Sequence, residues 1–168
     1  FANSLRTQGV KKGDRVGILM AQGVATAIAH LATYKLGAIA VPLFSLFGLD
    51  ALSYRINNAG IHVVITHHDG LRKLQEIREQ LPKLELIYNA EQDSHTQEAR
   101  SFWLELREQS AEFLAEYTLA EDPAVIIYTS GTTGKPKGAC HAHRVLLGHL
   151  PGVETSHNNN FTGNDLVF

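Results

Sequence analysis

The sequence predicts an α/β fold with a mostly parallel sheet flanked by helices. Short apolar runs alternate with segments whose apolar residues recur at helical spacing, which is typical of strand–helix–strand units. The strand-like runs lie roughly 20–25 residues apart, enough chain for a crossover helix between parallel neighbours. Hydrophobic residues make up 44% and charged residues 19% of the 168 residues, which fits one globular domain and excludes a disordered chain.

The first half of the chain is expected to hold three strands and two helices. The strands are expected at 15–20, 39–43 and 62–66, and the helices at 22–36 and 50–58. Gly37 and Gly60 follow the two helices, as is common at a helix C-terminus. Pro42 lacks an N–H, so it indicates either an edge strand or a position near the end of its strand. Three successive β-branched residues, 63–65, predict a strand that is buried on both faces.

The second half is expected to continue the alternation. A helix is predicted at 69–81, strands at 84–88 and 124–128, an exposed polar loop at 91–100 and a last helix at 144–149. Pro82 and Pro151 are expected to end the first and the last of these helices. Phe102, Leu106 and Phe113 indicate an amphipathic helix between the two strands.

Charge and cysteine content exclude several classes of protein. Fifteen basic and seventeen acidic residues give a formal charge of −2, without the basic stripe of a nucleic-acid-binding protein. Cys140 is the only cysteine, so no internal disulfide can form and a reducing compartment is expected. The apolar runs fall short of the ~20 residues of a membrane helix. With no leader sequence at its start, the protein is predicted to be cytoplasmic. Because the chain begins at Phe1 and not Met, it is also expected to be a fragment of a longer protein.

The segment from Tyr128 to Gly138 is the main candidate for a functional site. After the tyrosine it contains three glycines, four hydroxyl side chains and two lysines, and nothing suited to a core. Glycines let backbone N–H groups approach phosphate oxygens, hydroxyls donate further hydrogen bonds, and lysines supply positive charge. These residue types predict a loop that binds a polyanion through Thr129, Ser130, Gly131, Thr132, Thr133, Gly134, Lys135, Lys137 and Gly138.

Two common phosphate-binding motifs do not describe this segment. A P-loop needs Gly, four residues and then Gly-Lys-Ser/Thr, but here Gly134 and Lys135 are followed by Pro136. The GxGxxG fingerprint of dinucleotide-binding proteins does not fit either. A solvated turn is the alternative interpretation of so polar a segment.

The segment resembles the signature loop of the adenylate-forming superfamily, which includes acyl-CoA synthetases, luciferases and the adenylation domains of peptide synthetases. That loop reads Tyr/Phe-Thr/Ser-Ser-Gly-Thr/Ser-Thr-Gly-x-Pro-Lys-Gly, and residues 128–138 match every specified position. Residues 5–18 and 34–43 also resemble segments of these ligases, and 45–55 resembles acetate-like and medium-chain acyl-CoA synthetases. The resemblance implies that 1–168 is part of the large N-terminal AMP-binding domain, with the C-terminal remainder absent.

The resemblance implies an ATP-dependent carboxylate–CoA ligase. Members of the family join a carboxylate to the α-phosphate of Mg-ATP, release pyrophosphate, and then transfer the acyl group to coenzyme A. It further implies that the loop holds the ATP phosphates, that Lys137 is the most important charged group, and that His141 lies beside the acyl pocket and helps to shape it. The expected cofactors and partners are ATP, Mg²⁺, coenzyme A, a small carboxylic acid and the missing part of the enzyme.

Two motifs of the family, aromatic-Gly-x-Thr-Glu and a Ser/Thr-Gly-Asp at the expected distance, do not occur in the chain, so the isolated chain is predicted to be inactive. The alternatives are a non-catalytic module that binds nucleotide or polyphosphate, and the adenylation domain of a peptide synthetase. His141 and His143 could bind a metal, but no further ligands accompany them at suitable spacing, so no metal site is predicted. Cys140 is expected to be a small packing residue, because no base is placed to activate it.

Overall fold

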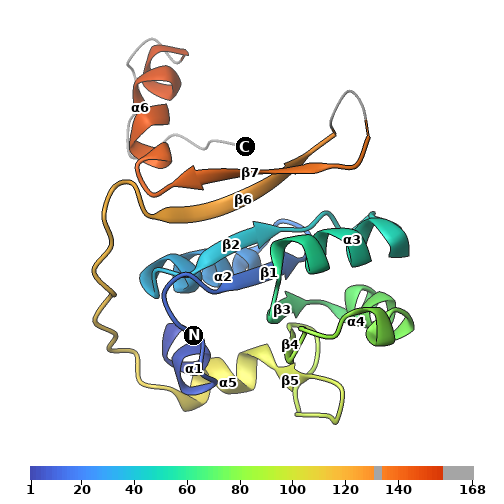
Figure 1. Ribbon diagram of the computed structural model, residues 1–168. Coiled ribbons are helices and arrows are strands. Elements are labelled where there is room, and N and C mark those ends of the chain that lie inside the picture. The colour runs from blue at the N-terminus through green and yellow to red at the C-terminus, as the bar shows by residue number, and fades with distance from the viewer. Residues whose placement is uncertain (131–133, 157–168) are drawn as a thin grey trace.

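The computed structural model describes residues 1–130 and 134–156, in which strands and helices alternate along most of the chain (Figure 1). The strands are β1 (Arg15–Leu19), β2 (Ile39–Pro42), β3 (Val63–Thr66), β4 (Leu86–Asn89), β5 (Arg100–Ser101), β6 (Pro123–Thr129) and β7 (Lys137–Ala142). The helices are α1 (Ala2–Thr7), α2 (Val24–Lys35), α3 (Leu49–Ala59), α4 (His68–Glu76), the short 3-10 helix η1 (Arg78–Gln80), α5 (Phe102–Glu108) and α6 (Val145–Ser156).

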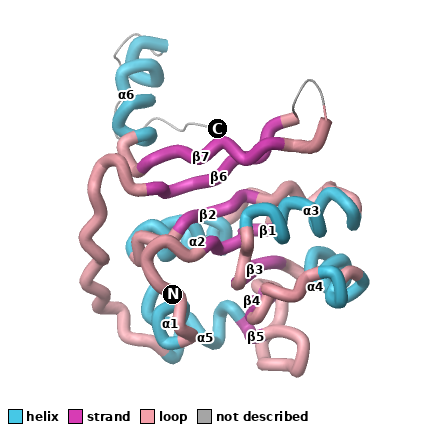
Figure 2. The backbone as a smooth tube through the Cα atoms, in the orientation of Figure 1, coloured by secondary structure: helices cyan, strands magenta, loops and turns pink. Residues whose placement is uncertain are grey.

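The strands of the described residues form one seven-stranded sheet in the order β5-β4-β3-β1-β2-β6-β7 (Figure 2). Neighbouring strands are parallel throughout, except that β6 and β7 form an antiparallel hairpin. The predicted α/β class with a mostly parallel sheet is therefore confirmed.

Helices cover both faces of the sheet, and alternate strand residues supply two cores. Val63 and Ile65 of β3 pack in the core formed with α1, α2 and α5, whereas Val64 packs in the core formed with α3 and α4. All four residues of β3 are buried, which confirms the prediction of a strand covered on both faces. The reason is the period of two, which sends successive side chains to opposite faces.

The second strand lies inside the sheet, between β1 and β6. Of the two interpretations of Pro42, an edge strand is therefore wrong and a position near the strand end is confirmed, because Pro42 is the last residue of β2. The missing N–H of Pro42 does not break the ladder there, since the next residue, Leu43, donates to the Ile18 carbonyl at 2.9 Å.

Two helices end at positions other than those predicted. The helix expected over 69–81 is α4, which stops at Glu76 and is followed by η1. Its apolar stripe is nevertheless buried as the spacing predicts, at Leu71, Leu74, Ile77 and Leu81. The last helix does not stop before Pro151 but runs through it to Ser156. Among the helices of the described residues, none has the length and apolar character needed to cross a membrane.

The first helix is not predicted by the apolar pattern, because part of its attachment to the sheet is polar. Ser4 of α1 is fully buried and donates to Oε2 of Glu105 at 2.8 Å. Its hydroxyl also shares a hydrogen bond of 3.1 Å with the Tyr88 hydroxyl of β4. Phe113, expected within the amphipathic helix, instead lies beyond the end of α5, where its ring centroid is 4.1 Å from the guanidinium carbon of Arg6.

The buried hydroxyl of Tyr88 predicts a loss of stability at high pH. Burial raises the pKa of Tyr88 to about 12, whereas an unfolded tyrosine titrates near ~10. Above pH ~10 the unfolded chain therefore releases a proton that the folded chain keeps, and the free energy of unfolding should fall by about 2 kcal/mol by pH ~11.5. Urea denaturation at pH ~9 and ~11.5 should show this loss in the wild-type chain and a smaller loss in Tyr88→Phe. Tyr117→Phe, at a position 81% exposed, is the control and should behave like wild type.

Candidate functional site

The candidate site lies at the turn of the hairpin formed by β6 and β7. Tyr128 faces Gly138 across the hairpin, and Thr129 faces Lys137 as the last pair before the turn. Thr129, Lys137 and Gly138, which the sequence analysis places in a loop, are therefore strand residues. The connection that remains, residues 130–136, is called the glycine-rich loop below. Of this loop the structure describes Ser130, Gly134, Lys135 and Pro136, whereas the predicted site residues Gly131, Thr132 and Thr133 lie outside the described residues.

The described loop residues have the conformation and charge that an anion site needs. Gly134 has φ +108°, which residues with a Cβ rarely adopt, and a Cβ built there would meet nothing within 4 Å. Lys135 and Lys137 are both exposed. Within the described residues neither lysine forms an ion pair with a carboxylate. Among the described residues, the end of the hairpin therefore presents two positive charges without a carboxylate partner.

Helix α3 holds the two strands of the hairpin close to the turn. The Tyr128 hydroxyl donates to Oδ1 of Asn58 at 2.6 Å, and the Tyr54 hydroxyl donates to the carbonyl of Pro136 at 3.1 Å. The Nζ atom of Lys135 lies 5.4 Å from the ring centroid of Tyr54. Tyr54 and Asn58 are not predicted as site residues from the sequence, because the residue types on a polar helix face do not show what the face contacts.

Gly138 serves the packing of the hairpin. A Cβ at this position would lie 2.8 Å from Cγ2 of Ile126 and 3.3 Å from Cζ of Tyr128. The Ile126 methyl group and the Tyr128 ring therefore occupy the space that a side chain at 138 would need. A glycine at 138 is predicted from the sequence to allow the close approach of phosphate, and the packing of the hairpin gives a second reason for it.

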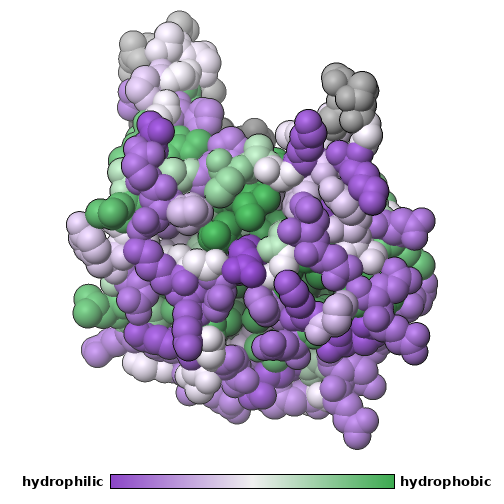
Figure 3. Space-filling view, viewed as in Figure 1, coloured by the Kyte–Doolittle hydropathy of each residue, from purple (hydrophilic) through white to green (hydrophobic). Residues whose placement is uncertain are grey.

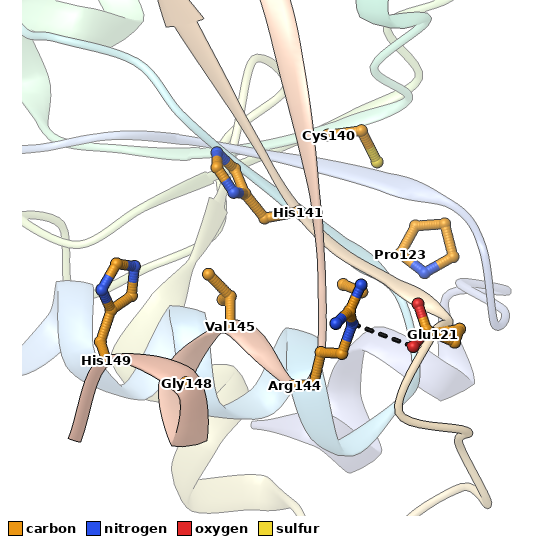
Figure 4. A pocket seen from close by; sticks show the side chains of 9 residues that line it. Glu121, Pro123, Cys140, His141, Arg144, Val145, Gly148 and His149 are labelled. Atoms are coloured by element: carbon orange, nitrogen blue, oxygen red, sulfur yellow. Dashed lines mark ion pairs between the residues drawn. The ribbon is translucent and has the colours of Figure 1, made fainter. Parts of the chain in front are cut away.

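His141 lies at the other end of β7 from the glycine-rich loop. It lines a hollow of about 580 Å³ between β7 and α6 (Figure 4). His141 is four positions along the strand from Lys137, a distance of about 13 Å at the usual rise per residue. One side of the hollow is held by an ion pair of 3.0 Å between Nε of Arg144 and Oε1 of Glu121. The structure therefore groups the predicted phosphate-binding residues but separates His141 from them.

Cys140 does not pack in a core. It is exposed, and its side chain projects from β7 on the side opposite to His141 (Figure 4). The expectation of a buried packing residue is wrong within the described residues, because β7 is the last strand of the sheet and no described helix covers this part of it. In the described part of the chain, no three His, Cys, Asp or Glu side chains lie close enough together to hold a metal ion.

Apolar side chains of the hairpin are exposed among the described residues. In the space-filling view a patch of apolar surface lies on the described part of the molecule (Figure 3). Ile127 of β6 is 44% exposed, although β6 is the most apolar strand in the sequence. Exposed apolar side chains on a strand of this kind are typical of a surface that another part of a protein covers.

Comparison with known proteins gives a consistent result. The chain matches the AMP-binding enzyme family over residues 1–167. It is 36% identical over 171 residues to an acetyl-coenzyme A synthetase of Alkalilimnicola ehrlichii, covering 94% of this chain and 26% of that protein. It is 40% identical over 154 residues to an acetyl-coenzyme A synthetase of Streptomyces coelicolor, covering 83% of this chain and 24% of that protein.

Solved structures agree with this match. The anthranilate CoA ligase AuaEII, crystallised with anthranoyl-AMP, superposes with a TM-score of 0.81 at 33% identity. The superposition covers 85% of this chain and 27% of that one. The chain thus spans about a quarter of the length of the proteins that it matches.

The close packing of Gly138 against Ile126 and Tyr128 predicts that a methyl group at 138 is not tolerated. Gly138→Ala should displace the Ile126 side chain and the Tyr128 ring and lower the free energy of unfolding by about 1–3 kcal/mol, as expected for overpacking. Thermal unfolding followed by circular dichroism should therefore show a lower melting temperature. Ala139→Ser, at the exposed next position of β7, is the control and should melt like wild type. An unchanged melting temperature for Gly138→Ala would contradict this packing role.

Proposed function

The chain belongs to the AMP-binding enzyme family, and from this membership we propose that it is part of an ATP-dependent carboxylate–CoA ligase. The acetyl-coenzyme A synthetases among its relatives support a ligase that uses coenzyme A over the adenylation domain of a peptide synthetase. The chain then forms a partial N-terminal AMP-binding domain, and the complete enzyme supplies the rest of the active site. We propose a small carboxylic acid as substrate and the cytoplasm, where ATP and coenzyme A are available, as the location.

The proposed reaction has two steps. In the first, a carboxylate oxygen attacks the α-phosphorus of ATP, the bond to the β-phosphate oxygen breaks, and pyrophosphate leaves with acyl-AMP as the other product. In the second, the thiol of coenzyme A attacks the acyl carbon, AMP leaves, and the thiol proton is released. Mg²⁺ takes part as the companion of the ATP phosphates, and so as part of the substrate.

In this reaction the end of the hairpin binds the β- and γ-phosphates. Lys137 and Lys135 provide positive charge to the phosphates and to the pyrophosphate that leaves. Thr129 and Ser130 offer hydroxyl donors, and Gly134 allows the backbone to approach the phosphate oxygens. The same role is proposed for Gly131, Thr132 and Thr133, which complete the motif. His141 is proposed to shape the acyl pocket from its place in the hollow beside α6.

The observation that carries the proposal is the pair of exposed lysines at the hairpin turn without carboxylate partners among the described residues. Two exposed positive charges beside a glycine that lets the backbone approach closely are suited to bind a polyanion. The proposal is tested by assaying the complete enzyme against a panel of carboxylic acids. Release of pyrophosphate that depends on one of these acids is expected, and no release with any acid would contradict the proposed function.

Lys137 provides the first specific prediction. In the complete enzyme, Lys137→Ala should reduce adenylation tenfold or more, because one preorganised charge contact is worth roughly 2–4 kcal/mol in the transition state. Its melting temperature should be unchanged, because the side chain is exposed. Pyrophosphate exchange and thermal unfolding measure the two effects, and Lys83→Ala, at another exposed lysine, is the control. If Lys137→Ala unfolds, the lysine has a structural role and its assignment to phosphate is wrong.

The isolated chain provides a second prediction. Residues 1–168 should show no acid-dependent pyrophosphate exchange, because the family motifs for adenine, magnesium and ribose do not occur in them. The complete enzyme, assayed in parallel, is the positive control. Robust exchange by the isolated chain would show that the chain contains a complete adenylation site.

A further inference from the structure

We propose that helix α3 positions the glycine-rich loop for phosphate binding, with Tyr54 and Asn58 as the positioning residues. The proposal rests on the proposed function of the loop. It concerns two short segments that flank the turn, called the first stem (128–130) and the second stem (134–138). Neither Tyr54 nor Asn58 needs to touch the nucleotide, because both act through the backbone and side chains of the stems.

The first stem is held through the hydroxyl of Tyr128. This hydroxyl lies 2.6 Å from Oδ1 of Asn58 and 3.4 Å from the carbonyl oxygen of Arg55, so α3 offers it two acceptors. Burial raises the pKa of Tyr128, which keeps its hydroxyl protonated and able to donate. On its other side the Tyr128 ring fills the space over Gly138. A single side chain thus links the helix to both strands of the hairpin.

The second stem is held through the carbonyl of Pro136. A proline has no N–H, so its carbonyl oxygen is the one backbone group through which this residue can be hydrogen-bonded. Tyr54 donates to it at 3.1 Å. Pro136 lies between Lys135 and Lys137. A fixed Pro136 carbonyl therefore limits the positions that the backbone of both lysines can take. The Tyr54 ring also approaches Nζ of Lys135, at 5.4 Å from the ring centroid.

Arg55 of α3 packs against the ring of Tyr128, the residue that holds the first stem. It is only 7% exposed, and within the described residues its guanidinium forms no ion pair. Its guanidinium carbon lies 4.0 Å from the ring centroid of Phe47 and 5.6 Å from that of Tyr128, and Nη1 donates to the carbonyl of Ala51 at 2.8 Å. A buried cation that is stabilised by two aromatic rings fixes the position of those rings, because the attraction is lost if either ring moves away.

The arrangement on the helix explains why two anchors suffice. Tyr54 and Asn58 are four residues apart, so they lie on one face of α3, one turn from each other. This face meets the hairpin at the two stems, through Pro136 and Tyr128. If only a fraction of molecules holds the stems in the binding conformation, the apparent affinity for phosphate falls by that fraction. The anchors should therefore affect ATP binding more than the stability of the fold.

The test uses Tyr54→Phe and Asn58→Leu in the complete enzyme. Each removes one hydrogen bond to a stem and keeps a side chain of similar size. Amide hydrogen exchange without nucleotide should be faster in the two stems, and the KM for ATP should rise about two- to tenfold for each lost hydrogen bond. The KM for the acid should not change. The melting temperature should stay within about 2 °C of wild type, since neither position is in the core.

The matched control is Asn57→Leu. Asn57 is the neighbouring asparagine on α3, and its Nδ2 donates to the carbonyl of Gln80 at 2.8 Å, away from the hairpin. This variant should leave exchange in the stems and the KM for ATP unchanged. Tyr128→Phe should raise the KM for ATP at least as much as Asn58→Leu, because it also removes the contact with the Arg55 carbonyl. Adding Asn58→Leu to Tyr128→Phe should have no further effect, because no hydroxyl is left for Asn58 to accept from.

The outcomes separate this proposal from the proposed function. Faster exchange in the stems together with a higher KM for ATP supports both. Unchanged exchange in Tyr54→Phe and Asn58→Leu overturns the role of α3, whatever the enzyme does with ATP. Faster exchange with an unchanged KM in an active enzyme also overturns it, because the anchors would then not matter to phosphate binding. Faster exchange in an enzyme that does not use ATP supports the anchors and rejects the proposed function.

Discussion

The antiparallel pairing of β6 with β7 is the constraint on which the candidate site depends. The pairing continues to Thr129 and Lys137, so it fixes both ends of the glycine-rich loop in the same ladder. On the other side, β6 pairs with β2 only where Ala40 faces Val125, near the start of β6. The part of the hairpin next to the turn therefore lies beyond the pairing with β2. Hydrogen bonds from α3 fix this part instead.

The distribution of charge around the hairpin follows from the same geometry. Some cations of the structure form ion pairs with carboxylates, for example Lys12 with Asp122 at 2.7 Å. Lys135, Lys137 and Arg55 have no such partner among the described residues. Arg55 is stabilised by aromatic rings instead, whereas the two lysines reach solvent. Three cations without carboxylates near one turn produce a positive field at the place where the proposed function needs an anion to bind.

The sequence predicts those parts of the fold that depend on local apolar periodicity. The run from Val63 to Ile65 identifies a strand that is buried on both faces. The apolar spacing over α4 also predicts the correct buried residues, including those after the α-helix has ended and the 3-10 helix η1 follows. Strand β7 is not predicted, because residues 137–142 contain no alternation of apolar and polar side chains. They form a strand because β6 pairs with them, which is a tertiary effect. Helix α1 is missed for a similar reason, since Ser4 is buried by its polar partners.

The candidate site shows the same division between local and tertiary information. Residue types identify the groups that can meet a phosphate, because glycine, hydroxyl and lysine side chains have this chemistry wherever they occur. They do not identify Tyr54 and Asn58, which are ordinary residues on the polar side of a helix until the hairpin is placed above them. Gly134 and Gly138 show that one motif contains both local information and information about tertiary packing. The first glycine is required by its own backbone angle, and the second by the side chains of Ile126 and Tyr128. A motif that binds a ligand therefore also encodes the packing that holds it in place.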